Sequence, residues 1–338
     1  MKVQSKELAA FDKLYAQGVI NQQDGTRLYL AASEGPGECV AVNAGTGERF
    51  RVWNEPGGTM TICQLNGRGD FLANQRFLPV FDAAACELVW AERVPEGYRI
   101  HEVQNIPYLH RFDLLEVAGK KMFIGATLCG GKKYQQDWSQ PGAVYVGSVL
   151  ADPMQGIELR PVLTGLTKNH GLCTTKFDGK RVVLIAAGEG VFVIEPPQNL
   201  DGEWTTRQLT GEEASEVAVV DFDGDGKDEL VTIEGFHGNK VIVRKEKDGK
   251  WENIYTMDIE FGHALWGGKL LGENRVLAGW RRGENKLVCL TCRADGVQVD
   301  EIGTGGPSQL TVWEENGEAY ILSADRQDGK AVLYTLSE

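Results

Sequence analysis

The chain contains five histidines, and three of them recur at equivalent points of a repeated sequence pattern. His110, His170 and His263 each open a short apolar segment, and Glu216 opens a fourth. A turn and a second apolar segment follow each opener, as from His170 to Ile185. Imidazoles that converge with one carboxylate are suitable ligands for Mn²⁺, Zn²⁺, Ni²⁺ or Fe²⁺. A single histidine is more often a structural residue, but this recurrence predicts a central metal site made by the four side chains.

A second set of metal-ligand residues lies in the segment Asp221-Phe-Asp-Gly-Asp-Gly-Lys-Asp-Glu229. Asp221, Asp223, Asp225 and Glu229 stand at positions 1, 3, 5 and 9 of this turn, and a glycine at position 6 permits a sharp bend. Thr232 at position 12 excludes an EF-hand, which needs a glutamate there. We expect a structural Ca²⁺ site in this turn. The alternative is an acidic turn satisfied by its own backbone and by neighbouring lysines.

Other polar residues follow the second apolar segment of a repeat, or lie in loops that would reach the same end of the fold. His237, Glu189 and His101 are candidates for the base or the acid in proton transfer, to which a histidine is suited because its free pKa lies near 6.5. The candidates for substrate binding are cationic or aromatic: Arg76, Tyr134, Trp138, Arg281 and Arg326. The arginines favour an anionic or polyhydroxylated ligand. Taken singly, each could instead be a solvated loop residue or part of a salt bridge.

Short runs rich in Val, Ile, Leu and Tyr alternate with Gly, Asn and Asp turns after residue 20, a pattern that predicts β-strands. Strands must therefore position these side chains. The paired segments occur seven times in 338 residues, or about 48 residues each, the size of a four-stranded propeller blade. The sequence therefore predicts an all-β, seven-bladed β-propeller as a single domain over residues 1–338. We expect residues 1–25 and 305–338 to close the ring by sharing a blade. Ser5–Tyr15 is the one expected helix.

The segment from Asp221 to Leu230, followed by an apolar strand, resembles the FG-GAP/VCBS repeat of β-propellers, although only this unit carries the repeat intact. A longer stretch resembles the propeller part of aldos-2-ulose dehydratase and related metal-dependent sugar lyases. It contains Ile100-His-Glu-Val-Gln, Trp138-Ser-Gln-Pro-Gly and Asn169-His-Gly-Leu. This resemblance implies a propeller that eliminates a group from a sugar. Oligogalacturonate lyases, also seven-bladed propellers, hold a divalent ion with histidines and an amide, and the set of ligands here is similar in kind.

The overall charge limits the expected partners. The chain has 35 basic and 48 acidic residues, a net charge of −13, and no basic run that would bind phosphates or an anionic bilayer. No apolar stretch approaches the roughly 20 residues of a membrane-spanning helix, and the first residues lack the apolar core of a secretion signal. We therefore expect a cytoplasmic protein whose partner is a small carbohydrate. The oligomeric state is not indicated by the sequence.

These observations predict a divalent-metal-dependent carbon–oxygen lyase that acts on a keto-sugar, a keto-glycoside or a uronate. A metal ion held at the axis would polarise the carbonyl and stabilise the enolate formed when the adjacent C–H bond breaks. Tyr134 and Trp138 would stack on the sugar and exclude water. The alternative is a non-catalytic propeller that binds carbohydrate or protein, in which calcium only stiffens a blade.

Overall fold

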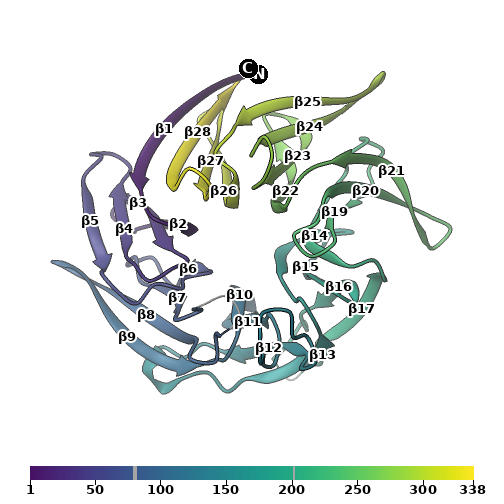
Figure 1. Cartoon of the computed structure of the whole chain (residues 1–338). Helices are drawn as coiled ribbons and strands as arrows, with labels where there is room; N and C mark the ends of the chain where they lie inside the picture. The colour runs from purple at the N-terminus through teal and green to yellow at the C-terminus, as the bar shows by residue number, and fades with distance from the viewer. Residues whose placement is uncertain (79–81, 201) are drawn as a thin grey trace.

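The computed structural model describes residues 1–78, 82–200 and 202–338, and the chain is almost entirely β-strand in these ranges. Seven antiparallel sheets of four strands each stand around a central axis (Figure 1). The predicted all-β, seven-bladed β-propeller is therefore confirmed. Within the described ranges the helical content is the short 3₁₀ helix η1 (Pro153–Gln155), and no helix there is long and apolar enough to cross a membrane.

Each blade runs from an inner strand at the axis to an outer strand at the rim. The inner strands are β2 (Leu14–Asn21), β6 (Ile62–Gln64), β10 (Leu109–Val117), β14 (Gly171–Phe177), β18 (Ala214–Val220), β22 (Gly262–Leu270) and β26 (Pro307–Glu315). The second strands are β3 (Arg27–Ser33), β7 (Phe71–Gln75), β11 (Lys120–Thr127), β15 (Lys180–Ala187), β19 (Glu229–Glu234), β23 (Glu273–Trp280) and β27 (Glu318–Asp325). The third strands are β4 (Cys39–Asn43), β8 (Glu87–Val94), β12 (Gly142–Ser148), β16 (Gly190–Glu195), β20 (Lys240–Lys247), β24 (Leu287–Arg293) and β28 (Lys330–Ser337). The outer strands are β5 (Arg49–Trp53), β9 (Gly97–Asn105), β13 (Arg160–Leu166), β17 (Thr205–Thr210), β21 (Lys250–Asp258), β25 (Gly296–Gly303) and β1 (Lys2–Ala10).

The two ends of the chain meet in the last blade. Strand β1 pairs antiparallel with β28, with Lys2 opposite Ser337, and the two termini lie together in Figure 1. The expected helix over Ser5–Tyr15 is wrong, because these residues belong to β1, a turn and the start of β2. The physical reason is that β28 would otherwise present an open edge of backbone hydrogen-bonding groups. Pairing β1 with this edge stabilises the fold more than formation of one short isolated helix would.

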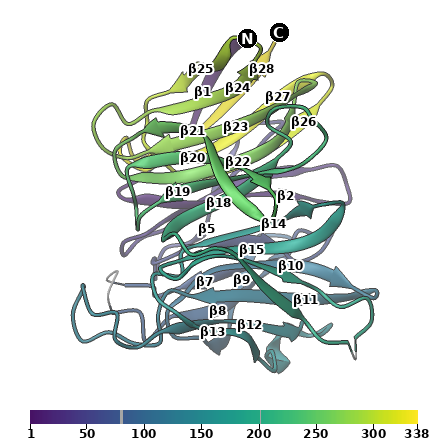
Figure 2. The same cartoon turned by 90° about the vertical axis from the view of Figure 1, so that its right-hand side faces the viewer.

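The core consists of apolar layers between neighbouring blades. Figure 2 shows the strands of several blades lying one above another. Strand β15 illustrates how the sequence builds them. Val183 and Ile185 pack toward the β10–β13 blade, whereas Val182 and Leu184 pack toward the β18–β21 blade. Successive side chains of a strand point to opposite faces, so a strand covered on both faces reads as a continuous apolar run. Each such buried side chain stabilises the fold by about 1.5–3 kcal/mol.

The inner strands share an irregularity that bears on function. In five blades the pairing register shifts where the inner strand begins, which marks a β-bulge. The residues left out of the pairing at these shifts are Tyr15, His110, Ser215, His263 and the pair Ser308–Gln309. A bulge redirects the side chain of the extra residue. The bulges therefore present equivalent side chains of different blades at one level of the axis.

Candidate metal centre

Four imidazole rings and one phenol ring meet at the axis of the propeller. The ring centre of His170 lies 4.4 Å from that of His110, 4.8 Å from that of His237 and 4.9 Å from that of His263. The hydroxyl of Tyr15 lies 3.2 Å from Nε2 of His110 and 3.3 Å from Nε2 of His263. The structure thus brings together the three histidines predicted as openers, and adds His237 and Tyr15 to them.

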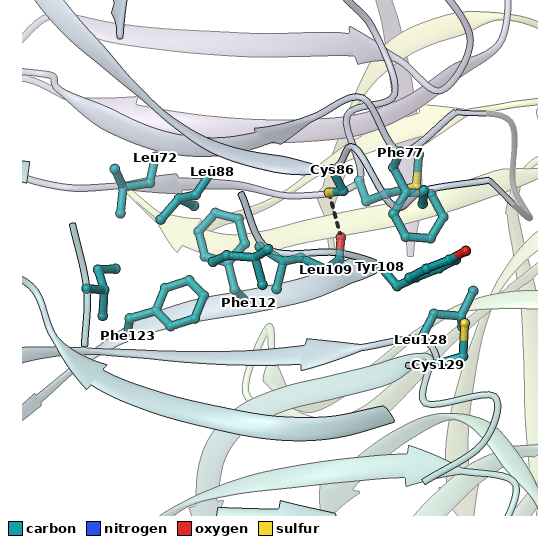
Figure 3. Packing of buried hydrophobic residues seen from close by; sticks show 14 of the residues in the cluster. Leu72, Phe77, Cys86, Leu88, Tyr108, Leu109, Phe112, Phe123, Leu128 and Cys129 are labelled. Carbon is teal, nitrogen blue, oxygen red and sulfur yellow. Dashed lines mark hydrogen bonds between the residues drawn. The ribbon is translucent and has the colours of Figure 1, made fainter. Parts of the chain in front are cut away.

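Figure 3 shows the buried packing around Leu109 and Phe112, which precede and follow His110 in the chain. The carbonyl oxygen of Leu109, the preceding residue, accepts hydrogen bonds from the Cys86 thiol at 3.5 Å and from the Asn74 amide at 2.8 Å. Phe112, two residues after His110, packs against Phe123 in the same buried cluster. The start of β10 is therefore held on both sides of the histidine.

Backbone carbonyls fix the orientation of two of the rings. Nδ1 of His170 donates to the carbonyl of Ser215 at 3.0 Å, and Nδ1 of His263 donates to the carbonyl of Ser308 at 2.9 Å. Both acceptors are bulge residues of the next blade. Because a carbonyl can only accept, the proton of each neutral ring lies on Nδ1 and Nε2 keeps its lone pair. This is the usual support of a metal-binding histidine.

The positions of the nitrogens fit a divalent transition metal. Nε2 of His237 lies 3.2 Å from Nε2 of His170, and ligand atoms of these two residues and His263 all lie within 4.8 Å of one another. Metal–nitrogen bonds of about 2.0–2.1 Å in tetrahedral geometry hold two nitrogens roughly 3.3 Å apart. Two lone pairs at the observed distance repel unless a proton or a cation lies between them. A metal ion bound by the three rings removes this repulsion.

Burial keeps these imidazoles uncharged. It is the main cause that lowers the pKa of His110, His237 and His263 well below the usual value, and it lowers the pKa of His170 to about 3 with a further contribution from Arg111. A histidine must be deprotonated to bind a metal. The rings are therefore in the ligand form at neutral pH.

Glu216 lies behind His170 and not among the Nε2 atoms. Its Oε1 is 3.0 Å from Nδ1 of His170 and 3.4 Å from the guanidinium of Arg111. The bulge explains this position, since it makes Ser215 the equivalent of the bulged histidines and displaces Glu216 by one residue. Burial raises the pKa of Glu216 to about 7, while Arg111 opposes that rise. The contacts favour a role in orienting His170 over the predicted role as a metal ligand.

A cavity of about 290 Å³ opens over the histidines, on the side of the loops that follow the second strands. Its lining is largely aromatic and cationic: Tyr15, Glu34, Met60, Phe77, His110, Leu128, Lys132, Gln135, Trp138, His170, Phe236, His237, Phe261, His263, Arg281 and Arg282. Beyond the histidines, a smaller cavity of about 130 Å³ is lined by residues that include Arg111, Glu216 and Gln309. The larger cavity is the space in which a ligand can reach the imidazoles.

One wall of this cavity is formed by the loop after β11. Trp138 packs edge-on against Phe236 at 5.2 Å, and the amine of Lys132 lies 3.1 Å from the centre of the Trp138 ring. Trp138 thus lies where the sequence predicted it, at the cavity. Tyr134, in the same loop, is 59% exposed and does not line the cavity within the described part of the chain.

Two predicted acid–base residues lie away from the cavity. Glu189 accepts hydrogen bonds from the backbone amide of Thr167 at 2.8 Å and from its hydroxyl at 2.7 Å, and so closes a turn. His101 belongs to β9, the outer strand of its blade, where it contacts Glu92 at 2.9 Å and stacks on Trp90. The prediction that a loop brings His101 inward is not met, because this segment is a strand at the rim.

The three predicted arginines differ in their surroundings. Arg281 lines the cavity. Arg76 instead pairs with Glu87 at 2.6 Å, and Arg326 pairs with Glu34 at 2.7 Å. Within the described ranges neither Arg76 nor Arg326 lines the cavity. Of the three, Arg281 is the one placed to contact a ligand.

The acidic turn after β18 already contains a cation from the protein. The ammonium of Lys245 lies 2.8 Å from Asp225 and 3.4 Å from the buried Glu229, and it also pairs with Asp223. Carboxylate oxygens of Asp221, Asp223 and Asp225 lie within 4.8 Å of one another and could hold a metal ion. Lys245 thus contacts three of the four carboxylates predicted to bind Ca²⁺, which is the contact with a neighbouring lysine that the alternative prediction described.

Tyr15 and Arg111 also lie at this centre, although neither was predicted from the sequence. Tyr15 stands at the beginning of the apolar β2 segment, the position that opens the other blades, but the expected helix concealed it. Arg111 directly follows an opener, and its guanidinium lies 5.7 Å from the centre of the Tyr15 ring. An alignment of all seven openers that included the first blade would have revealed Tyr15.

Comparison with known proteins identifies the fold only. No family profile and no curated protein sequence matches the chain. A chain of a mitotic checkpoint complex matches with a TM-score of 0.61 and 8% identity, over 99% of this chain and 93% of that one. Sqt1 of Saccharomyces cerevisiae matches with a TM-score of 0.58 and 8% identity, over 99% and 98%. A catalytically inactive variant of virginiamycin B lyase from Staphylococcus aureus, solved with quinupristin, matches with a TM-score of 0.57 and 14% identity, over 99% of both chains.

Proposed function

We propose that the protein is a divalent-metal-dependent carbon–oxygen lyase that acts on a keto-sugar, a keto-glycoside or a uronate. The observation that carries the proposal is the convergence of His170, His237 and His263 at the base of an open cavity. The propeller fold shared with virginiamycin B lyase supports a lyase at the level of fold. The variant of that enzyme is described as inactive and has a histidine replaced by alanine.

The residues of the chain divide into those that hold the metal and those that exchange protons. His170, His237 and His263 would hold the ion, which when bound supplies a Lewis acid that polarises the substrate carbonyl. Tyr15 keeps its proton at neutral pH because burial raises its pKa, and its hydroxyl lies within hydrogen-bond distance, 3.2 Å, of Nε2 of His110. We assign this pair to the proton transfers of elimination, since both residues line the cavity and lie in contact.

The shape of the cavity supports a substrate of monosaccharide size. Its volume of about 290 Å³ is just below the range of roughly 300–1,000 Å³ for ligand pockets. The Trp138 ring adds apolar surface to the cavity wall for a sugar, on the side that the amine of Lys132 does not cover. A longer saccharide would place only its terminal residue at the histidines.

The proposal is tested by His170→Ala with His101→Ala as the matched control. We expect the wild-type protein with Mn²⁺ or Zn²⁺ to convert 3-keto-glucosides, other keto-sugars or uronates into unsaturated products, followed by their ultraviolet absorbance. His170→Ala should lose both bound metal and product formation. His101→Ala should keep both, because His101 lies on an outer strand. If the metal-loaded protein forms no unsaturated product from any of these sugars, the lyase function is wrong and the alternative, a non-catalytic binding propeller, is favoured.

A further inference from the structure

The cavity wall beside the histidines has an excess of positive charge. The charged residues that line the cavity, apart from the histidines, are Glu34, Lys132, Arg281 and Arg282. Glu34 pairs with Arg326, which lies just outside, at 2.7 Å. Lys132 donates to the backbone carbonyls of two residues of its own loop, at 2.8 and 2.9 Å. In the described ranges Arg281 and Arg282 form no ion pair within 4.0 Å.

Arg281 is held in place but not satisfied. Its backbone amide donates to the carbonyl of Phe261 at 3.0 Å, and its guanidinium carbon lies 5.3 Å from the centre of the Phe261 ring. Arg282 lies over the same ring at 4.6 Å. Nε of Arg281 is buried and has no hydrogen-bond partner in the described part of the chain. A guanidinium that stacks on an aromatic ring keeps its in-plane N–H groups available for a carboxylate or a phosphate.

The guanidinium also lies near the imidazoles, since Arg281, His237 and His263 line the same cavity. A bound divalent cation would add further positive charge to the same cavity, opposite uncharged imidazoles. Two unpaired cationic centres around one partly enclosed space are unfavourable unless an anion lies between them. A neutral sugar cannot supply that charge.

We propose that the sugar bound in this cavity carries an anionic group, a carboxylate or a phosphate ester, and that Arg281 binds this group. This inference rests on the proposed function, since it takes the substrate to be a sugar that lies in the same cavity. It narrows the substrate class to acidic sugars. The planar guanidinium would bind the anion through two parallel N–H···O bonds, and this contact would fix which carbon of the sugar faces the histidines.

The test is isothermal titration of the Mn²⁺-loaded protein with three probes: glucuronate, glucose 6-phosphate and glucose. We expect at least one of the acidic sugars to bind 10- to 100-fold more tightly than glucose, as charge-assisted hydrogen bonds require. The acid that binds more tightly identifies the anionic group. Arg281→Gln should abolish the preference for an acidic sugar. Arg281→Lys should keep part of this preference, because lysine carries the same charge but lacks the two parallel N–H donors of arginine. Arg76→Gln is the matched control and should keep the full preference, because Arg76 pairs with Glu87 outside the cavity.

Two results would overturn the inference: equal binding of all three probes by the wild-type protein, or an unchanged preference in Arg281→Gln. Metal content and the melting temperature show whether Arg281→Gln is folded. The same measurements separate this inference from the proposed function. If the wild-type protein binds an acidic sugar through Arg281 but does not bind metal or does not catalyse elimination, only the proposed lyase function is refuted. Normal metal binding and elimination without a preference for acidic sugars refutes the present inference alone.

Discussion

Replacement of Glu216 by glutamine distinguishes an orienting carboxylate from a metal ligand. Oε1 of Glu216 lies 3.0 Å from Nδ1 of His170, on the opposite side of the ring from Nε2. Residues that support a metal-binding histidine typically change metal affinity by about 10- to 100-fold, or about 1.4–2.8 kcal/mol. Glutamine keeps an oxygen near Nδ1 of His170 but removes the negative charge that pairs with the guanidinium of Arg111. We therefore expect Glu216→Gln to weaken Zn²⁺ or Mn²⁺ binding by about tenfold, and Glu216→Leu by about 100-fold.

The assay is calorimetric titration of the metal-free protein, with Glu189→Gln as the matched control. Glu189 accepts hydrogen bonds from Thr167 away from the cavity, so its replacement should leave metal affinity unchanged. The stoichiometry should stay at one ion per chain in every variant. An affinity of Glu216→Gln within twofold of the wild type would refute the orienting role. A complete loss of binding in a folded Glu216→Gln protein would show that the carboxylate is itself a ligand.

Three further predictions concern other parts of the structure. Tyr15→Phe should keep its metal but lose at least about 100-fold in turnover, as expected of an acid–base residue; unchanged turnover would exclude Tyr15 from proton transfer. Burial raises the pKa of Asp325 to about 6, whereas the pKa of an aspartate in the unfolded chain is near 3.9. Because the folded protein therefore favours the protonated carboxyl, the free energy of unfolding should fall by up to about 3 kcal/mol as the pH rises from about 4 to about 6. Asp325→Asn should flatten that fall in denaturant titrations, and an unchanged pH dependence would contradict the assignment. Lys245→Met should lower the melting temperature and make it rise on addition of Ca²⁺, because the carboxylates around Lys245 lose their cation; a melting temperature that Ca²⁺ does not change would exclude a cation site in this turn.

The fold followed from the sequence because each blade repeats one arrangement of apolar segments and turns. Val182 to Ala187 illustrates the signal, since a strand buried on both faces is apolar at every position. The expected helix over Ser5–Tyr15 failed for a reason that lies outside the segment. The partner of β1 is β28, at the other end of the chain, and local sequence does not record that pairing.

The site was predictable in part. The repeat marked His110, His170 and His263, because equivalent positions in a propeller share one level of the axis. The repeat did not indicate where the pairing between the first and second strands of a blade shifts by one residue. The bulge at Ser215 causes such a shift and moves the carboxylate of Glu216 away from the Nε2 atoms. His101 was misplaced because distance from the axis depends on strand order within a blade, which sequence spacing does not specify.

Anomalous diffraction from crystals soaked in Zn²⁺ and Mn²⁺ tests the metal centre most directly. We predict an anomalous peak at each metal's absorption edge within about 2.0–2.3 Å of Nε2 of His170, His237 and His263. Density at the axis that shows only water, or a peak confined to the turn of Asp221–Glu229, would contradict a metal centre at the propeller axis.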